Sequence, residues 1–184
     1  MEKVKAVITG VGGYVPEYIL TNEELARMVD TNDEWITTRV GIKERRILKE
    51  EGLGSSYLAR KAAKQLIQKT GVDPQTIDCV ICATTTSDYR FPSNASIVIG
   101  KLGLTNAHGF DVSCACCGFL YTVDMASTFI ESGRYKRVMV IAAEKMSSIV
   151  DYQDRQTCVL FGDGAAAVML EATTEEGVGF QDSF

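Results

Sequence analysis

The sequence is poor in histidine, tryptophan and proline, with one, one and three residues in a chain of 184. A single histidine leaves no histidine-rich ligand set for zinc, and no second cluster of N, S or O ligands is spaced to replace one. No segment approaches the roughly 20 apolar residues that span a bilayer. The N-terminus also lacks the charged, apolar and cleavage regions of a signal peptide. We therefore expect no metal and no membrane, and a cytoplasmic location.

Positive charge is also in short supply. The chain carries 19 Lys and Arg against 24 Asp and Glu, a formal net charge of -5, which argues against nucleic acid as the main partner. Hydrophobic residues make up 46% and charged residues 23%, the composition of a globular domain with a substantial core. The six cysteines are expected to be thiols, because disulfides are rare in the cytoplasm.

Apolar strand-like runs alternate with helical patterns along the chain. Thr21 with Glu24 forms a capping-box signal for a first helix, and residues 10–13, Gly-Val-Gly-Gly, predict a turn that ends the first strand. No linker, low-complexity tract or short internal repeat divides residues 1–184, so we expect one α/β domain with helices on both faces of a mixed sheet of about five strands, one edge strand being antiparallel. The expected strands are 4–9, 79–83, 109–112, 137–143 and 165–170, and the expected helices are 22–29, 55–69, 93–102 and 119–130.

The most informative segment runs from Asp111 to Phe119, Asp-Val-Ser-Cys-Ala-Cys-Cys-Gly-Phe. An apolar strand enters a turn of small residues, and a helical pattern follows. Cys116 therefore lies where a strand meets a helix N-terminus, whose unpaired N–H groups and dipole favour the thiolate. This position predicts a nucleophilic cysteine.

Other interpretations of the cysteines are open from the residues alone. Cys114, Cys116 and Cys117 are equally consistent with small core residues, because free cysteine packs as a hydrophobe. Cys79 and Cys82 have C-x-x-C spacing, but residues three apart on a strand face opposite sides and do not chelate together. His108 is near Cys116 in sequence, although the intervening strand is expected to carry the two apart.

Two further segments combine residue types with chemical meaning. Residues 31–46 hold Trp35 beside four cationic side chains, which suits a nucleotide and also suits a partly buried tryptophan with a solvated charge run. Residues 161–165, Phe-Gly-Asp-Gly-Ala, predict a tight turn into a strand, because they lack the lysine and hydroxyl residue of a P-loop.

Taken together, these segments resemble the condensing enzymes of the thiolase fold, and β-ketoacyl-acyl carrier protein synthase III in particular. The resemblance covers essentially the whole chain, and the joint order of the motifs makes it specific. The matching segments are Thr21-Asn22, Asp33 to Ile36 with Arg39, Gly41-Ile42, Arg45-Arg46, Phe91 to Ser93, Asp111 to Phe119, Asp154-Arg155 and Phe161 to Ala165.

The resemblance implies a thiolase-like half with three α/β/α layers and a reaction at Cys116. This cysteine is expected to be acylated by an acyl-coenzyme A, and the acyl group then to condense with malonyl-acyl carrier protein, with coenzyme A thioester as substrate and no cofactor. Trp35 and Arg155 match the residues that sandwich the adenine, and Thr31 and Arg39 match its neighbours. Phe91 matches a residue that reaches the acyl pocket across a homodimer.

Two departures from the family pattern stand out. Cys114 and Cys117 occupy positions where small residues such as alanine or serine are usual. The family's catalytic histidine and asparagine lie in a C-terminal half, whereas this chain ends at Phe184, so we expect the chain to be inactive alone and to need that half. Another thiolase-like enzyme (a hydroxymethylglutaryl-coenzyme A synthase or a polyketide starter synthase) and a non-catalytic partner subunit are the alternatives.

Overall fold

The computed structural model describes residues 4–181 and contains a mixed five-stranded sheet. The strand order is β1 (Lys5–Tyr14), β7 (Asp163–Thr173), β6 (Arg137–Lys145), β4 (Cys79–Ala83) and β5 (His108–Val112). β4 is parallel to both of its neighbours, β5 and β6, while β7 is antiparallel to β6 and β1.

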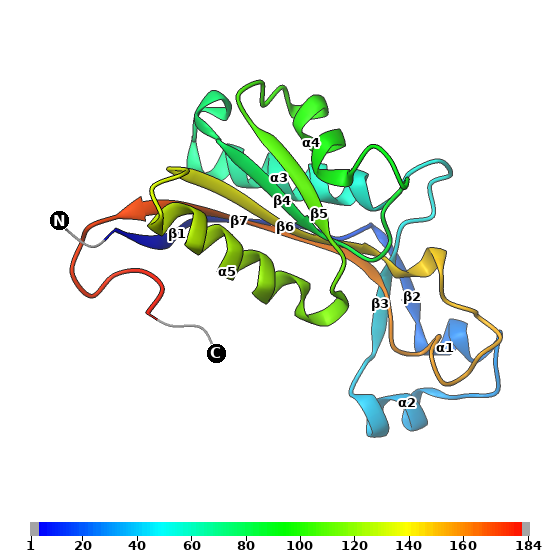
Figure 1. Ribbon diagram of the computed structural model, residues 1–184. Coiled ribbons are helices and arrows are strands. Elements are labelled where there is room, and N and C mark those ends of the chain that lie inside the picture. Colours follow the sequence, from blue (N-terminus) through cyan, green and yellow to red (C-terminus); the bar gives the residue numbers. More distant parts are fainter. Residues whose placement is uncertain (1–3, 182–184) are drawn as a thin grey trace.

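Helices cover both faces of this sheet, as the alternation of patterns predicted (Figure 1). α3 (Ser55–Thr70) and α4 (Asn94–Leu102) lie on one face, and α5 (Gly118–Glu131) lies on the other. Each face has its own apolar core: Cys82 packs in the core under α3 and α4, and Cys79 in the core under α5. The two cysteines therefore do face opposite sides, and the three-layer α/β/α class is confirmed.

Residues 10–13 do not form the predicted turn, because β1 continues through them to Tyr14. Gly10 and Gly12 instead permit close packing on α3. A Cβ atom on Gly12 would lie 2.4 Å from the carbonyl oxygen of Ala62 and 2.6 Å from the backbone nitrogen of Leu66, both on α3. The strand passes so near the helix that a side chain does not fit. Close approach of another backbone is one reason for which glycine is used in strands.

The antiparallel strand is not confined to an edge, which corrects the predicted topology. β7 lies inside the sheet, because the long β1 pairs with it from Lys5 opposite Thr173 to Tyr14 opposite Ala165. The edge strand β1 pairs antiparallel with β7 and so runs in the same direction as β6, β4 and β5, whereas the expected antiparallel strand was at an edge. The order could not be read from the sequence because the two partners are about 160 residues apart in the chain.

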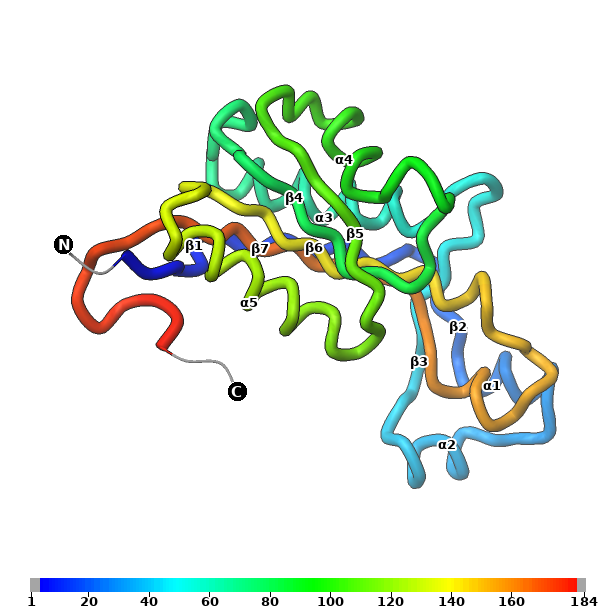
Figure 2. Tube along the Cα trace, in the orientation of Figure 1, coloured from blue at the N-terminus to red at the C-terminus, as the bar shows by residue number. Residues whose placement is uncertain are grey.

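A small module projects from one end of the sheet and is called the hairpin module below. It comprises residues 18–47 and 149–160, and both segments meet at the lower right of Figure 2. Their side chains share a third apolar core around Leu25, Ile36 and Cys158. The first segment contains β2 (Tyr18–Thr21), α1 (Asn22–Leu25), α2 (Asp33–Val40) and β3 (Glu44–Ile47), with β2 and β3 antiparallel.

α1 begins as predicted and ends earlier. The Thr21 hydroxyl accepts from the Glu24 N–H at 3.2 Å, which is the expected N-cap. The helix stops at Leu25 instead of continuing to 29, and the turn that follows it is exposed at residues 26–28. Among residues 4–181, no helix is long and apolar enough to cross a membrane.

Candidate functional site

The cysteine turn connects the end of β5 to the start of α5 and has an unusual backbone. Cys116 lies in a single 3-10 turn, Ala115–Cys117, immediately before Gly118 begins α5. Ala115 has a φ of 46°, which is uncommon for a residue with a side chain. The Cys117 N–H donates to the Cys114 carbonyl at 3.2 Å and closes the turn. The expected position of Cys116, between a strand and a helix N-terminus, is confirmed.

Cys116 lines a cavity of about 620 Å³ at the carboxyl ends of β4 and β6. Of the three neighbouring cysteines only Cys116 is in this wall, although all three are exposed. The hairpin module forms the opposite wall through Ile42 and Arg46. The cavity is therefore a cleft between the main sheet and the hairpin module, with Cys116 in its wall.

The floor of the cavity holds a carboxylate that sequence reasoning missed. Glu144, near the end of β6, accepts from the Thr85 N–H at 2.7 Å and the Thr85 hydroxyl at 3.1 Å, and also from the Thr86 hydroxyl. Both threonines follow β4. A signal was present, because β4 and β6 are parallel and the carboxyl ends of neighbouring parallel strands meet at one sheet edge.

Asp163, at the start of β7, forms hydrogen bonds to the segment after β3 and to the segment after β6 at the same edge of the sheet. Its carboxylate accepts from the Leu48 N–H at 2.8 Å, the Ser147 N–H at 2.8 Å and the Ser147 hydroxyl at 2.6 Å. The sequence predicted a tight turn around this residue, but neither flanking glycine has a positive φ. A Cβ on Gly162 would lie 3.0 Å from the carbonyl oxygen of Arg46, so glycine here permits close packing on β3.

Trp35, Arg39 and Arg155 form a second cluster on the hairpin module. The guanidinium carbon of Arg155 lies 4.5 Å from the ring centroid of Trp35, and that of Arg39 lies 5.1 Å away. Asp30 pairs with Arg155 at 3.6 Å. Thr31 follows Asp30 in the chain, and its buried hydroxyl has no hydrogen-bond partner among the described residues. The structure therefore brings three of the four predicted nucleotide-site residues together, Trp35, Arg39 and Arg155.

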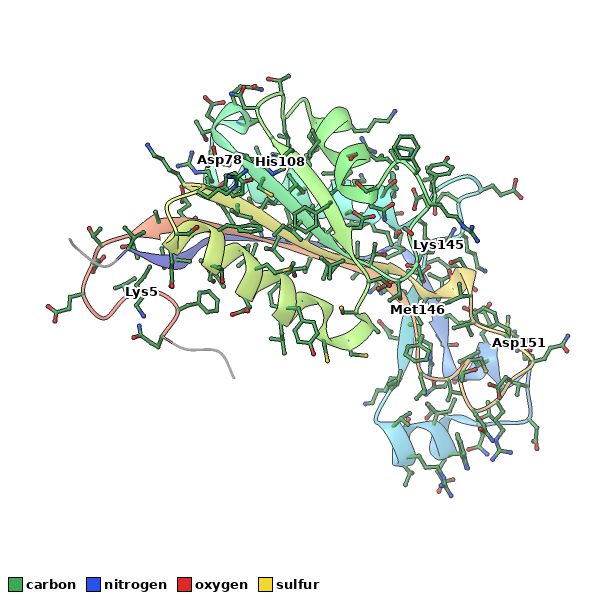
Figure 3. The ribbon with its side chains drawn as sticks, viewed as in Figure 1. Lys5, Asp78, His108, Lys145, Met146 and Asp151 are labelled. Atoms are coloured by element: carbon green, nitrogen blue, oxygen red, sulfur yellow. The ribbon has the colours of Figure 1, made fainter. Side chains whose placement is uncertain are left out.

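The remaining candidates lie apart from the cavity wall. Phe91, on the loop between β4 and α4, is 88% exposed and precedes Pro92 through a cis peptide bond. His108 begins β5 at the end of the sheet opposite Lys145 (Figure 3), and its Nε2 is 2.8 Å from the Tyr135 hydroxyl. The predicted separation of His108 from Cys116 is thus observed.

The buried cysteines differ in chemistry from those of the turn. Burial raises the pKa of Cys79 to about 11 and that of Cys82 well above its usual value. A thiol held neutral in this way is a poor nucleophile at neutral pH. Within residues 4–181 no group of three or more His, Cys, Asp or Glu side chains is arranged to hold a metal ion.

The three-layer architecture is similar to one half of the condensing enzymes of the thiolase fold. Within that class, the resemblance to β-ketoacyl-acyl carrier protein synthase III is confirmed. The sequence model of the 3-oxoacyl-[acyl-carrier-protein] synthase III family matches residues 110–184. The chain is 67% identical over 183 residues to β-ketoacyl-[acyl-carrier-protein] synthase III 2 of Bacteroides thetaiotaomicron, which covers all of this chain and 54% of that protein.

Solved structures agree with the sequence comparison. The synthase III of Aquifex aeolicus superposes with a TM-score of 0.89 at 49% identity, covering 93% of this chain and 55% of that one. The priming β-ketosynthase of the R1128 polyketide pathway gives 0.88 at 35% identity, covering 92% and 51%. The chain thus spans about half the length of the curated relatives it matches.

Proposed function

We propose that this chain carries the nucleophile and much of the coenzyme A site of a β-ketoacyl-acyl carrier protein synthase III, an acyltransferase that initiates fatty acid synthesis. The observation that supports this best is that Cys116 alone of the three turn cysteines lines the cavity. The thiol lies beside a helix N-terminus, where a negative charge is favoured.

The first half-reaction is transfer of an acyl group to Cys116. The thiolate attacks the carbonyl carbon of an acyl-coenzyme A, the bond from that carbon to the coenzyme A sulfur breaks, and coenzyme A leaves as a thiolate that takes up the proton lost by the Cys116 thiol. The backbone N–H of Cys116 is our candidate for one oxyanion donor during the attack. Trp35 and Arg155 would hold the adenine, with Thr31 and Arg39 beside it.

The second half-reaction is a decarboxylating condensation. Malonyl-acyl carrier protein loses carbon dioxide, the resulting carbanion attacks the acyl carbonyl on Cys116, and the carbon–sulfur bond breaks to release a β-ketoacyl product and the thiolate. We propose that a C-terminal half supplies the histidine, the asparagine and the second oxyanion donor for this step. Phe91, which is 88% exposed, would reach the acyl pocket of a second subunit in a homodimer.

The test is labelling with acetyl-coenzyme A that carries a heavy acetyl group, followed by peptide mass spectrometry. Label is expected on Cys116, and Cys116→Ala should abolish both labelling and condensation. Cys114→Ala is the matched control, because it removes a neighbouring exposed thiol that does not line the cavity. Label on Cys114 or Cys117 with Cys116 unmodified would overturn the proposal. Absence of any label, with an intact fold, would favour a non-catalytic partner subunit.

A second candidate is a polyketide starter synthase, favoured by the similarity to the R1128 priming β-ketosynthase at a TM-score of 0.88. The two candidates share acylation of Cys116. They differ in which acyl group is transferred and in which carrier protein takes part in the condensation. Competition between acetyl-coenzyme A and longer acyl-coenzyme A substrates for labelling of Cys116 distinguishes the two acyl groups.

A further inference from the structure

Arg45 is a buried cation of the hairpin module that has no carboxylate partner. It lies on β3 and is only 4% exposed. Among the described residues 4–181, no Asp or Glu side chain forms an ion pair with it. Burying a charge without a counter-ion costs free energy that other contacts must offset. The proposed acyl transfer and condensation give this arginine no role.

The guanidinium of Arg45 connects the two segments of the hairpin module. Its Nε donates to the Val159 carbonyl at 3.0 Å, and its Nη2 donates to the same oxygen. Val159 lies in the segment 149–160, four residues after Arg155. The Nη1 group donates to the side-chain oxygen of Asn22, the first residue of α1. One buried cation therefore holds the segment of Arg155 against β3 and α1.

Asn22 extends this network to both ends of α2. It is 1% exposed, and its amide nitrogen donates to the Asp33 carboxylate and to the Ile42 carbonyl, each at 2.8 Å. Asp33 is the first residue of α2, and Ile42 follows the residue that caps its C-terminus. A single amide therefore restrains the start and the end of the helix that carries Trp35 and Arg39.

The apolar contacts of α2 are too few to fix its position by themselves. Ile36 is the one buried residue of this helix and lies in the third apolar core, with Trp35 half-buried beside it. A surface helix is usually held by an apolar stripe of three to four side chains in every two turns. The hydrogen bonds of Asn22 should therefore supply a large share of what positions α2.

We propose that Arg45 and Asn22 are positioning residues of the coenzyme A site. Together they fix the separation between α2, from which Trp35 and Arg39 project, and the segment from which Arg155 projects. This inference rests on the proposed function, because it takes that cluster to be the nucleotide site. The hydrogen bonds are buried inside the hairpin module, so they do not depend on which face a C-terminal half covers.

The test measures steady-state kinetics of the complete enzyme. Arg45→Met removes the guanidinium. Asn22→Asp gives Arg45 a counter-ion, but it removes both amide donors that restrain α2. Each variant should raise KM for the acyl-coenzyme A about 5-fold or more, the lower end expected for loss of a base–aromatic stack. The fall in kcat should be smaller, because binding of the nucleotide is remote from Cys116.

The matched control is Lys43→Met, which removes an exposed cation of the same module. It should leave KM unchanged. In enzyme labelled with 5-fluorotryptophan, the Trp35 resonance is identified as the one that Trp35→Phe removes. This resonance should shift in Arg45→Met and in Asn22→Asp and keep its place in Lys43→Met. A loss of overall stability without displacement of α2 would not produce that pattern.

A double variant tests whether Arg45 acts through the cluster. If it does, Arg45→Met combined with Trp35→Ala should raise KM by less than the product of the two single effects. A rise equal to the full product would overturn the proposal. Asn22→Asp combined with Trp35→Ala gives the same test where Arg45→Met does not fold, because Arg45 then keeps a partner.

Failure of this inference differs from failure of the proposed function. An unchanged KM in Trp35→Ala would remove the nucleotide site, and this inference with it. A raised KM in Trp35→Ala, together with an unchanged KM in folded Asn22→Asp, would overturn the positioning role alone. So would a fall in kcat in Asn22→Asp without a rise in KM.

Discussion

At the scale of single residues, the Arg155 side chain covers the ring of Trp35. The Arg155 guanidinium carbon is 4.5 Å from the ring centroid, which leaves no room for a planar base between the two. Adenine binding by these residues therefore requires Arg155 to move outward. The ion pair that holds Arg155, to the fully exposed Asp30 at 3.6 Å, is of a kind that contributes little free energy, so the movement should be easy.

Trp35→Ala should weaken binding of the acyl-coenzyme A while leaving the chemical step largely intact. Loss of one base–aromatic stack costs roughly 1–3 kcal/mol, which corresponds to about a 5- to 150-fold rise in KM. The interaction is remote from Cys116, so kcat should fall less than KM rises. Steady-state kinetics of the complete enzyme measure both constants.

Lys43→Ala is the control for this prediction, because Lys43 is an exposed cation of the same module outside the Trp35 cluster. Its KM should stay near that of the parent enzyme. An unchanged KM in a well-folded Trp35→Ala enzyme would remove Trp35 from the nucleotide site.

At the scale of elements, the glycines of β1 set the distance between the strand and α3. Gly12→Ala places a methyl group 2.4 Å from the Ala62 carbonyl oxygen, and overpacking of this kind costs about 1–3 kcal/mol. Gly100→Ala on α4 is the matched control, with no atom within 4 Å of the new Cβ. It should stabilise the helix by roughly 0.5–1 kcal/mol. Urea unfolding gives both free energies, and equal effects would contradict this account.

Asp163 should stabilise the junction between β7, the segment after β3 and the segment after β6. Asp163→Asn replaces one acceptor oxygen by an amide that faces N–H or O–H donors, so at least one donor of Leu48 or Ser147 is left unpaired. We expect a loss of at least about 2 kcal/mol in the free energy of unfolding. Asp30→Asn removes an exposed ion pair and should change it by less than about 1 kcal/mol. Comparable losses in the two variants would argue against the role given to Asp163.

Elements with local signals were predictable from the sequence, and those fixed by distant contacts were not. The helix from Ser55 and the buried strand Cys79–Ala83 matched closely, because periodicity and caps act within a few residues. The place of β7 in the sheet, the close packing of Gly12 and the short α1 depend on contacts far along the chain. Cys116 was located by its strand–helix setting, whereas Glu144 joins the cavity only because two separate strands end together.

At the scale of the whole molecule, α5 presents an uncovered apolar face. Leu120, Tyr121 and Met125 are 66%, 55% and 37% exposed, and they follow directly after the cysteine turn. Large exposed apolar side chains grouped on one helix are typical of a surface that another protein element covers. We propose that the C-terminal half covers this face.

Residues 1–184 alone should therefore label slowly at Cys116 without forming product. The condensation step needs donors that we assign to the other half, and the loss of even one oxyanion donor typically costs about 10²–10³ in kcat. A condensation assay on the purified chain, repeated with a separately expressed C-terminal half, tests this. Robust β-ketoacyl product from the chain alone would show the assignment to be wrong. Sedimentation should show self-association of the isolated chain that the added half reverses.

The burial of β4 has a consequence for how this protein tolerates change over generations. All five residues from Cys79 to Ala83 are buried, with alternate side chains in the two cores. A larger or smaller side chain at any of them shifts the strand against one helical layer. The strand leads directly into Thr85 and Thr86, which hold Glu144 in the cavity. Inherited substitutions in β4 should therefore be selected against for two reasons: they disturb folding, and they change the shape of the cavity.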